Sequence, residues 1–113
     1  MANTFKQATK SSMSTAAVTS TDTNIVTAGG SATLILLSAM VANKTSTSAN
    51  VDVYIVTNSG DDTYLLKSVP VPAGSALELI SGSKIILESS DVLRARADTA
   101  SALDITVSYL EQT

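Results

Sequence analysis

The chain has 113 residues, the length of one modest domain, and its 44% apolar content is high enough for such a domain to fold. Its formal net charge of −3 and its sequence pI of about 4.6 argue against a nucleic-acid partner, which requires a basic surface. The sequence contains no His and no Cys, which removes the commonest general base, the thiolate nucleophile, disulfides and the softer metal ligands. We therefore expect a protein that is not an enzyme and needs no cofactor.

The first 23 residues are rich in Thr, Ser and Ala and contain one aromatic residue, Phe5. The start, MANTFKQATK, lacks the apolar core of a signal peptide, and the most apolar run, LILLSAMVA at residues 34–42, is far shorter than the about 20 residues of a membrane-spanning helix. We therefore expect a soluble, non-secreted protein with no membrane partner. The leader is either partly ordered, or an N-terminal arm or first strand that docks on a neighbouring subunit through Phe5.

The first strand candidates follow this leader. Residues 24–27 form a short one, and Gly29-Gly30 marks the turn after it. Residues 31–41 carry apolar side chains at both parities, which favours a strand that is central in a sandwich or half covered by a partner subunit. A helix is the alternative here, because Leu, Ala and Met are good helix formers.

A hairpin is predicted next, with arms at residues 51–57 and 63–69 and the turn NSGDD at residues 58–62. Tyr54 and Tyr64 lie on its two arms and could approach each other across the ladder. Asp61-Asp62 in the turn is explained by the local hydrogen bonds that Asp makes in turns, and a weak calcium site is the alternative.

The remaining sequence continues this pattern. The prolines of VPVPAG, Pro70 and Pro72, cannot donate ladder hydrogen bonds. This segment is therefore either an edge strand or a connection that crosses between the sheets. Turn signals at Gly82 and at two polar clusters separate four further strand candidates, at residues 75–80, 84–88, 92–97 and 102–111. Together these segments predict one all-β domain at residues 24–113, an antiparallel β-sandwich of jelly-roll or immunoglobulin-like kind, with an N-terminal arm at residues 1–23.

Two arginines, Arg94 and Arg96, share the polar side of one predicted strand, about 7 Å apart. A phosphate clamp is a poor fit, since no aromatic stacking partner is near in the sequence. A solvated face is one interpretation, and a contact with carboxylates of a neighbouring subunit is another. With Phe5, these arginines are our candidate subunit contacts. Three carboxylates, Glu78, Glu88 and Asp104, lie on the polar faces of predicted strands. We expect them to be solvated or paired across the sheet with Arg94, Arg96 or Lys84.

Residues 69–111 contain a proline-bearing turn followed by PAGS, an apolar strand, KIILE, the turn DVL, and a last strand that ends in Leu and Glu. This succession resembles the small β-sandwich virion structural proteins of tailed bacteriophages, most closely those from phages of cyanobacteria and marine bacteria. Weaker similarity reaches back through the hairpin at residues 51–67. The chain departs from the group at Ala28-Gly29-Gly30, where many members carry an aromatic residue and a proline.

The resemblance implies a virion structural protein. We expect a capsid decoration or cement protein that is made in the bacterial cytoplasm, binds the outer head surface and the major capsid protein, and stabilises the contacts between capsomers. Self-association, as a homotrimer, would also cover exposed edge strands. The alternatives are a neck, tail or baseplate accessory protein and, more remotely, a carbohydrate-binding module on a fibre. The resemblance assigns no catalytic, cofactor or metal residue.

Overall fold

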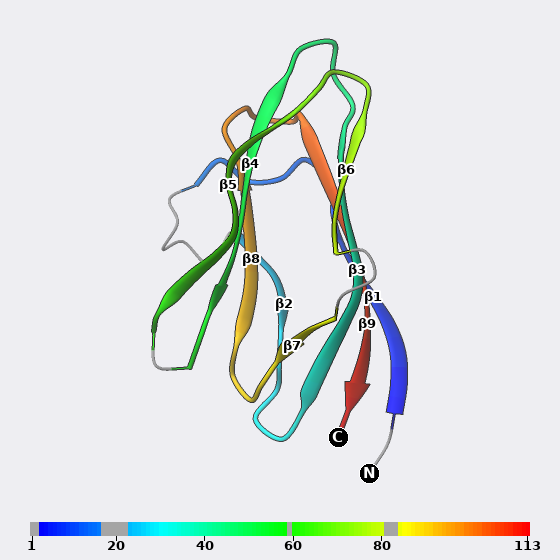
Figure 1. Cartoon of the computed structure of the whole chain (residues 1–113), viewed down its shortest axis with the longest axis vertical. Coiled ribbons are helices and arrows are strands. Elements are labelled where there is room, and N and C mark those ends of the chain that lie inside the picture. The colour runs from blue at the N-terminus through cyan, green and yellow to red at the C-terminus, as the bar shows by residue number, and fades with distance from the viewer. Residues whose placement is uncertain (1–2, 17–22, 59, 81–83) are drawn as a thin grey trace.

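The regular structure of this protein consists of β-strands. The computed structural model describes residues 3–16, 23–58, 60–80 and 84–113. Within these ranges there are nine strands (Figure 1): β1 (Asn3–Lys10), β2 (Asn24–Thr27), β3 (Thr33–Asn43), β4 (Ala49–Val56), β5 (Asp62–Val71), β6 (Ala76–Ile80), β7 (Ile85–Leu87), β8 (Val92–Ala97) and β9 (Leu103–Gln112). The predicted turn at Gly82 and the turn residue Ser59 lie outside the described residues.

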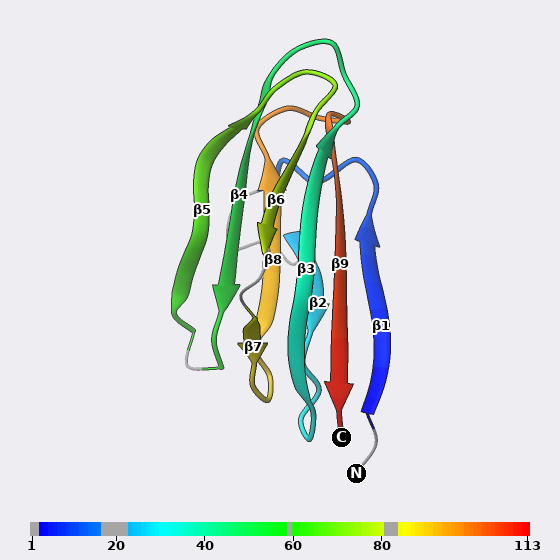
Figure 2. The ribbon, with the colours of Figure 1, turned by 45° about the vertical axis from the view of Figure 1, so that its right-hand side comes forward.

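The strands form two antiparallel sheets that pack face to face (Figure 2). Sheet A has the order β1-β9-β3-β6, with β7 also paired to β3, and sheet B has the order β2-β8-β4-β5. Consecutive strands alternate between the sheets, except for the β4–β5 hairpin and for β6 and β7, which pair with successive parts of β3. The expected antiparallel β-sandwich is confirmed, and its strand order is that of an eight-stranded jelly roll whose sixth strand is divided into β6 and β7.

The strand predicted at residues 31–41 corresponds to β3 (Thr33–Asn43), which lies between β9 on one side and β6 and β7 on the other. Leu34 and Leu36 face the core, a bulge follows between Leu36 and Ser38, and Ala39 and Val41 then face the core again. The extra residue shifts the alternation by one position, so core residues of one strand occur at both parities. The strand interpretation is therefore confirmed over the helix.

The core lies between the two sheets and is built from alternating residues of the long strands. In β8 and β9 these residues are apolar and alternate with polar ones, and all of them are buried except the half-buried Tyr109: Leu93, Ala95, Ala97, Leu103, Ile105, Val107 and Tyr109. Met13 adds a side chain that sequence patterns did not identify and that is 1% exposed. Its backbone N–H donates to the Leu103 carbonyl oxygen at 2.7 Å, which fixes the segment after β1 to sheet A.

The β4–β5 hairpin agrees with the prediction. Tyr54 and Tyr64 are register partners, and their ring centroids lie 5.3 Å apart at an interplanar angle of 37°. Pro70 lies in β5, which is an edge strand of sheet B, so its missing N–H interrupts no inner ladder. The chain then passes Pro72 and crosses to β6 in sheet A.

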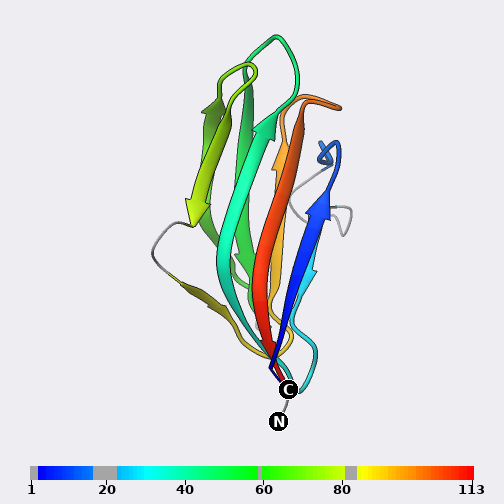
Figure 3. The ribbon, with the colours of Figure 1, turned by 90° about the vertical axis from the view of Figure 1, so that its right-hand side faces the viewer.

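Residues 3–10 of the leader form β1, which pairs along its whole length with β9 of the same chain, from Asn3 opposite Gln112 to Lys10 opposite Ile105. This strand has a weak pattern of its own, because Phe5 and Ala8 fall at opposite parities. Its position in sheet A is set by pairing with β9, whose apolar and polar residues alternate along most of its length. β1 is therefore an edge strand of sheet A (Figure 3).

Candidate functional surfaces

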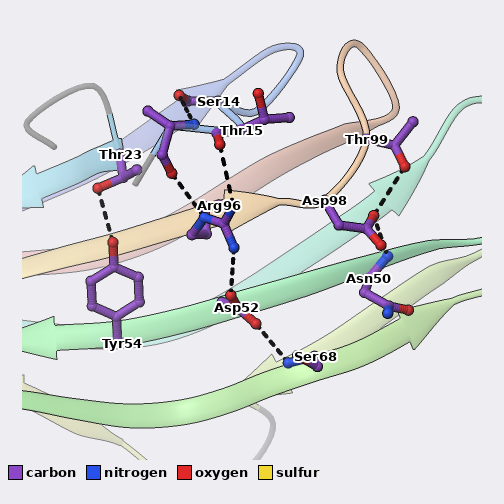
Figure 4. A network of polar contacts seen from close by, with 11 residues as sticks. Ser14, Thr15, Thr23, Asn50, Asp52, Tyr54, Ser68, Arg96, Asp98 and Thr99 are labelled. Atoms are coloured by element: carbon purple, nitrogen blue, oxygen red, sulfur yellow. Dashed lines mark hydrogen bonds and ion pairs between the residues drawn. The ribbon is translucent and has the colours of Figure 1, made fainter. Parts of the chain in front are cut away.

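The outer face of sheet B holds the two arginines that the sequence singled out. Arg96 places Nη1 3.0 Å from Asp52 Oδ2, and its Nε and Nη2 donate to the carbonyl oxygens of Ala16 and Thr15 at 2.8 and 3.2 Å (Figure 4). Arg94 Nε donates to Asn24 Oδ1 at 2.6 Å. Both side chains thus bind parts of the chain that precede or begin β2. A contact of either arginine with a neighbouring subunit stays a prediction.

Two other outward-facing side chains of sheet B are buried although they point away from the core. Asp52 is 8% exposed and Tyr54 is 0% exposed. Tyr54 Oη lies 3.0 Å from Thr23 Oγ1, and burial raises the pKa of the Tyr54 phenol above its ordinary value (Figure 4). Asp52 Oδ1 accepts a hydrogen bond from the Ser68 N–H at 2.6 Å. These contacts hold the leader and β5 to sheet B, so this network has a structural role.

One end of the sandwich gathers carboxylates around an open hollow of about 580 Å³, lined by Thr57, Asn58, Glu88, Ser89 and Asp91. Asp91 holds two turns together there, because Oδ1 accepts from the Asn58 N–H at 3.1 Å and Oδ2 accepts from the Glu88 N–H at 3.0 Å. The β4–β5 turn, with Asp61 and Asp62, is part of the same end. We call this region, with Asp61, Asp62, Glu88 and Asp91, the acidic end.

The acidic end holds several carboxylates that form no ion pair with the described basic residues. Three carboxylates elsewhere have basic partners, in the pairs Asp52–Arg96, Asp104–Lys44 and Glu111–Lys6. By contrast, Asp62, Glu88 and Asp91 form no ion pair with a basic residue in the described part of the chain. Among the described residues, Glu78 in sheet A and Asp98 after β8 also form no ion pair, but they lie on different elements, so the carboxylates without a basic partner gather chiefly at the acidic end. Sequence reasoning missed it, because the contributing turns meet only in the folded sandwich.

The expected pairing of the strand carboxylates is partly wrong. Asp104 Oδ1 pairs with Lys44 Nζ at 2.8 Å instead of with Arg94, Arg96 or Lys84. The hydrogen bond from Lys44 lowers the pKa of the Asp104 carboxyl, and the Ser12 N–H adds to the effect. The linear sequence does not predict this pair, because Lys44 lies in the loop after β3 and reaches Asp104 only through the β3–β9 register.

Phe5 lies on the outer face of sheet A, where its side chain is 76% exposed. Met40 and Ile86, the other exposed large apolar side chains of the described residues, are 43% and 56% exposed and belong to the same face. Figure 3 looks onto this face, and no described segment crosses in front of β3, β9 and β1. Sheet A thus presents an open apolar surface, whereas the leader contacts the outer face of sheet B.

Over residues 3–16, 23–58, 60–80 and 84–113, no group of three or more acidic side chains has an arrangement that could hold a metal ion. Within the same ranges there is no helix of the length and apolarity that crossing a bilayer requires.

No protein-family model matches the sequence, and no curated protein matches it. A solved structure does match: the NLP core of Drosophila, whose crystal structure is described as giving insight into pentamer formation and histone binding. It aligns with a TM-score of 0.54 at 11% sequence identity, over 97% of this chain and 99% of that chain. At this identity the likeness shows a shared β fold.

This comparison corrects the expected function. The sequence led us to expect a virion protein, either a capsid decoration or cement protein or a neck, tail or baseplate component, present as a homotrimer. The NLP core, which matches nearly the whole chain, is instead described in terms of pentamer formation and histone binding. The virion assignment is therefore wrong, the comparison gives no support to the capsid partner or the trimer, and the β-sandwich is confirmed.

Proposed function

We propose that this protein is a non-catalytic, self-associating β-sandwich whose acidic end binds a positively charged segment of another protein. The observation that carries the proposal is the group of carboxylates at one end of the sandwich, with Asp62, Glu88 and Asp91 lacking a basic partner in the described residues. Uncompensated charge of one sign attracts a partner of the opposite sign and accelerates its encounter.

The fold gives independent support to this proposal. The NLP core shares the fold along nearly its whole length and is described in terms of both pentamer formation and histone binding. Histones are basic proteins, and this chain has a formal net charge of −3. Each added copy in an assembly contributes the same charge again, so self-association multiplies the attraction for a basic segment that spans several copies.

A non-catalytic role agrees with the residues that are present. The sequence contains neither His nor Cys, so nucleophilic catalysis by a Ser–His or Cys–His pair has no base here. Asp91, one of the two carboxylates that line the hollow, accepts two backbone hydrogen bonds and thereby joins two turns. The geometry supports binding at this end and offers no arranged nucleophile.

The test measures binding of purified core histones to the whole protein by isothermal titration calorimetry at two salt concentrations. The variant Asp62→Asn/Glu88→Gln removes two negative charges from the acidic end. The matched control Glu78→Gln/Asp104→Asn removes the same charge from sheet A. We expect the first variant to weaken binding by about 10-fold and the control by less than about 2-fold, with weaker binding at high salt.

The outcomes separate the parts of the proposal. Absence of histone binding by the wild-type protein would contradict the proposed partner class. Equal losses in both variants would show that net charge alone matters and would contradict the acidic end as the site. Sedimentation velocity of the wild-type protein checks self-association separately, and a monomer at every concentration tested would contradict that part.

A further inference from the structure

An apolar row crosses the outer face of sheet A from one edge to the other. In the strand register, Phe5 of β1 is opposite Leu110 of β9, Leu110 is opposite Ile35 of β3, and Ile35 is opposite Ile86 of β7. Phe5 and Ile86 at the ends of the row are exposed, and Ile35 and Leu110 in its middle are half-buried. Four adjacent apolar side chains therefore form one continuous stripe instead of isolated surface residues.

The rows on either side of this stripe are polar but uncharged. One contains Asn3, Gln112 and Thr33, and the other contains Gln7, Ser108 and Ser38. The charged residues of this face, Glu78 and Asp104, lie farther along the strands, and Asp104 is paired with Lys44. An apolar centre within an uncharged polar surround matches the composition of protein–protein interfaces, whose cores are depleted in charge.

The size of the face suits association with a partner of similar size. The face is about 20 Å wide, because it has four strand positions at the usual spacing between strands. It is about 30 Å long, because its long strands have eight to eleven residues, and its projected area is therefore about 600 Å². The accessible surface of a corrugated face exceeds its projection. A standard interface buries about 800 Å² on each partner, so nearly the whole face would be used.

We infer that a second copy of this chain covers the outer face of sheet A, with the apolar rows of the two copies packed against each other about a two-fold axis. This inference rests on the self-association proposed above and assigns it a surface. A basic partner has no electrostatic reason to bind the uncharged row, so this contact is distinct from binding at the acidic end.

The two-fold arrangement follows from the placement of the exposed apolar side chains. Phe5, Met40 and Ile86 are the exposed large apolar residues of the described chain, and all lie on this one face. A head-to-tail contact would set the face against a more polar surface of the next copy. A two-fold axis in the plane of the interface superposes row on row, so each apolar stripe is buried by the other.

The first test compares assembly of the wild-type protein with that of Phe5→Thr/Ile86→Thr, by sedimentation velocity and native mass spectrometry. Thr is a good strand former, so the sheet should be retained, which circular dichroism checks. The matched control is Val56→Thr/Val92→Thr, an apolar cross-strand pair on the outer face of sheet B. We expect the first variant to raise the dissociation constant by about 30-fold or more and the control by less than about 2-fold.

A second test measures distances directly, because the chain has no Cys and a single introduced cysteine is unique. Spin labels at Ser108→Cys lie beside the row, whereas labels at Lys67→Cys lie on the edge strand β5 of the other sheet. In the inferred dimer the two Ser108 positions are closer to each other than the two Lys67 positions. The reverse order would overturn the inferred face.

Other results would also overturn the inference. If the folded Phe5→Thr/Ile86→Thr variant associates like the wild-type protein, the copies meet elsewhere while self-association itself stands. An assembly with an odd number of copies excludes a two-fold contact that uses every copy. A wild-type monomer contradicts the inference and the proposed self-association together, whereas histone binding at the acidic end is decided by its own titration.

Discussion

Asp52 and Arg96 are register partners on β4 and β8, and their charged atoms Oδ2 and Nη1 lie 3.0 Å apart. The other oxygen of Asp52 accepts the Ser68 N–H of β5 at 2.6 Å, and Arg96 also donates to carbonyl oxygens of the leader. One ion pair therefore connects three strands of sheet B with the segment before β2. Because the pair is mostly removed from water, the loss of either partner leaves a charge without its compensation.

We predict that Asp52→Ala lowers the free energy of unfolding by about 2 kcal/mol, because it leaves the Arg96 guanidinium without its counter-charge and the Ser68 N–H without its acceptor. Urea denaturation followed by circular dichroism measures this change. The control is Lys6→Ala, which removes the exposed Lys6–Glu111 pair and should have little effect. Equal effects of the two substitutions would contradict a structural role for the Asp52–Arg96 pair.

Asn43 is predicted to be intolerant of a charge. Its amide donates to the carbonyl oxygens of Thr47 and Val71 at 2.9 Å each, and its Oδ1 accepts from the Thr45 N–H and Oγ1. Asn43→Asp places a carboxylate against two carbonyl oxygens, so we expect a loss of about 2 kcal/mol at neutral pH. The loss should shrink at pH 3, where the new carboxyl can be protonated. Ser46→Asp in the exposed loop after β3 is the control, and a pH-independent loss in Asn43→Asp would contradict this explanation.

Tyr54 gives a prediction at alkaline pH. Burial holds the pKa of its phenol above the ordinary value of about 10, so the folded state favours the neutral form. This contribution to stability is complete below about pH 10 and is lost as the pH rises towards the raised pKa, because the unfolded chain ionises first. Between pH 9 and 12 the unfolding free energy of the wild-type protein should fall more steeply than that of Tyr54→Phe. Parallel curves for the two proteins would contradict the raised pKa.

Ser101 in the β8–β9 turn has a backbone φ of 59°, a left-handed conformation that glycine adopts without a steric penalty. Ser101→Gly should therefore increase the free energy of unfolding by about 0.5 kcal/mol, and Ser101→Val should decrease it by about 1 kcal/mol or more. Thermal denaturation measures both. Ser108→Gly in the middle of β9 is the control and should destabilise, because a strand interior favours a side chain.

Much of the fold was predictable where strands alternate strictly. The predicted bounds of β2 and β8 agree with the structure, and the residues of β8 on the side opposite Arg94 and Arg96 are buried. In β3 the alternation is interrupted between Leu36 and Ser38, and no local pattern indicates where a bulge occurs. The strand character of β1 was left open as well, since it comes from pairing with β9 and not from its own residues.

The candidate surfaces were less predictable, because they depend on which segments the topology brings together. Phe5 was identified as a candidate docking residue because it is the one aromatic residue of the leader. Its apolar neighbours Leu110, Ile35 and Ile86 follow only from the strand register. The Asp61-Asp62 turn was recognised as a turn. That Glu88 and Asp91 lie at the same end required knowing that the β7–β8 turn packs beside it.

The pairing of β1 with β9 places Asn3 opposite Gln112, so the two ends of the described chain lie side by side at one end of the sandwich (Figure 1). Antiparallel neighbours of this kind can be joined by a connection of two to five residues. A circular permutant with such a link, and with its new ends in the loop between β3 and β4, would retain every strand pair of both sheets. The order in which the strands are synthesised is thus separable from the order in which they pair.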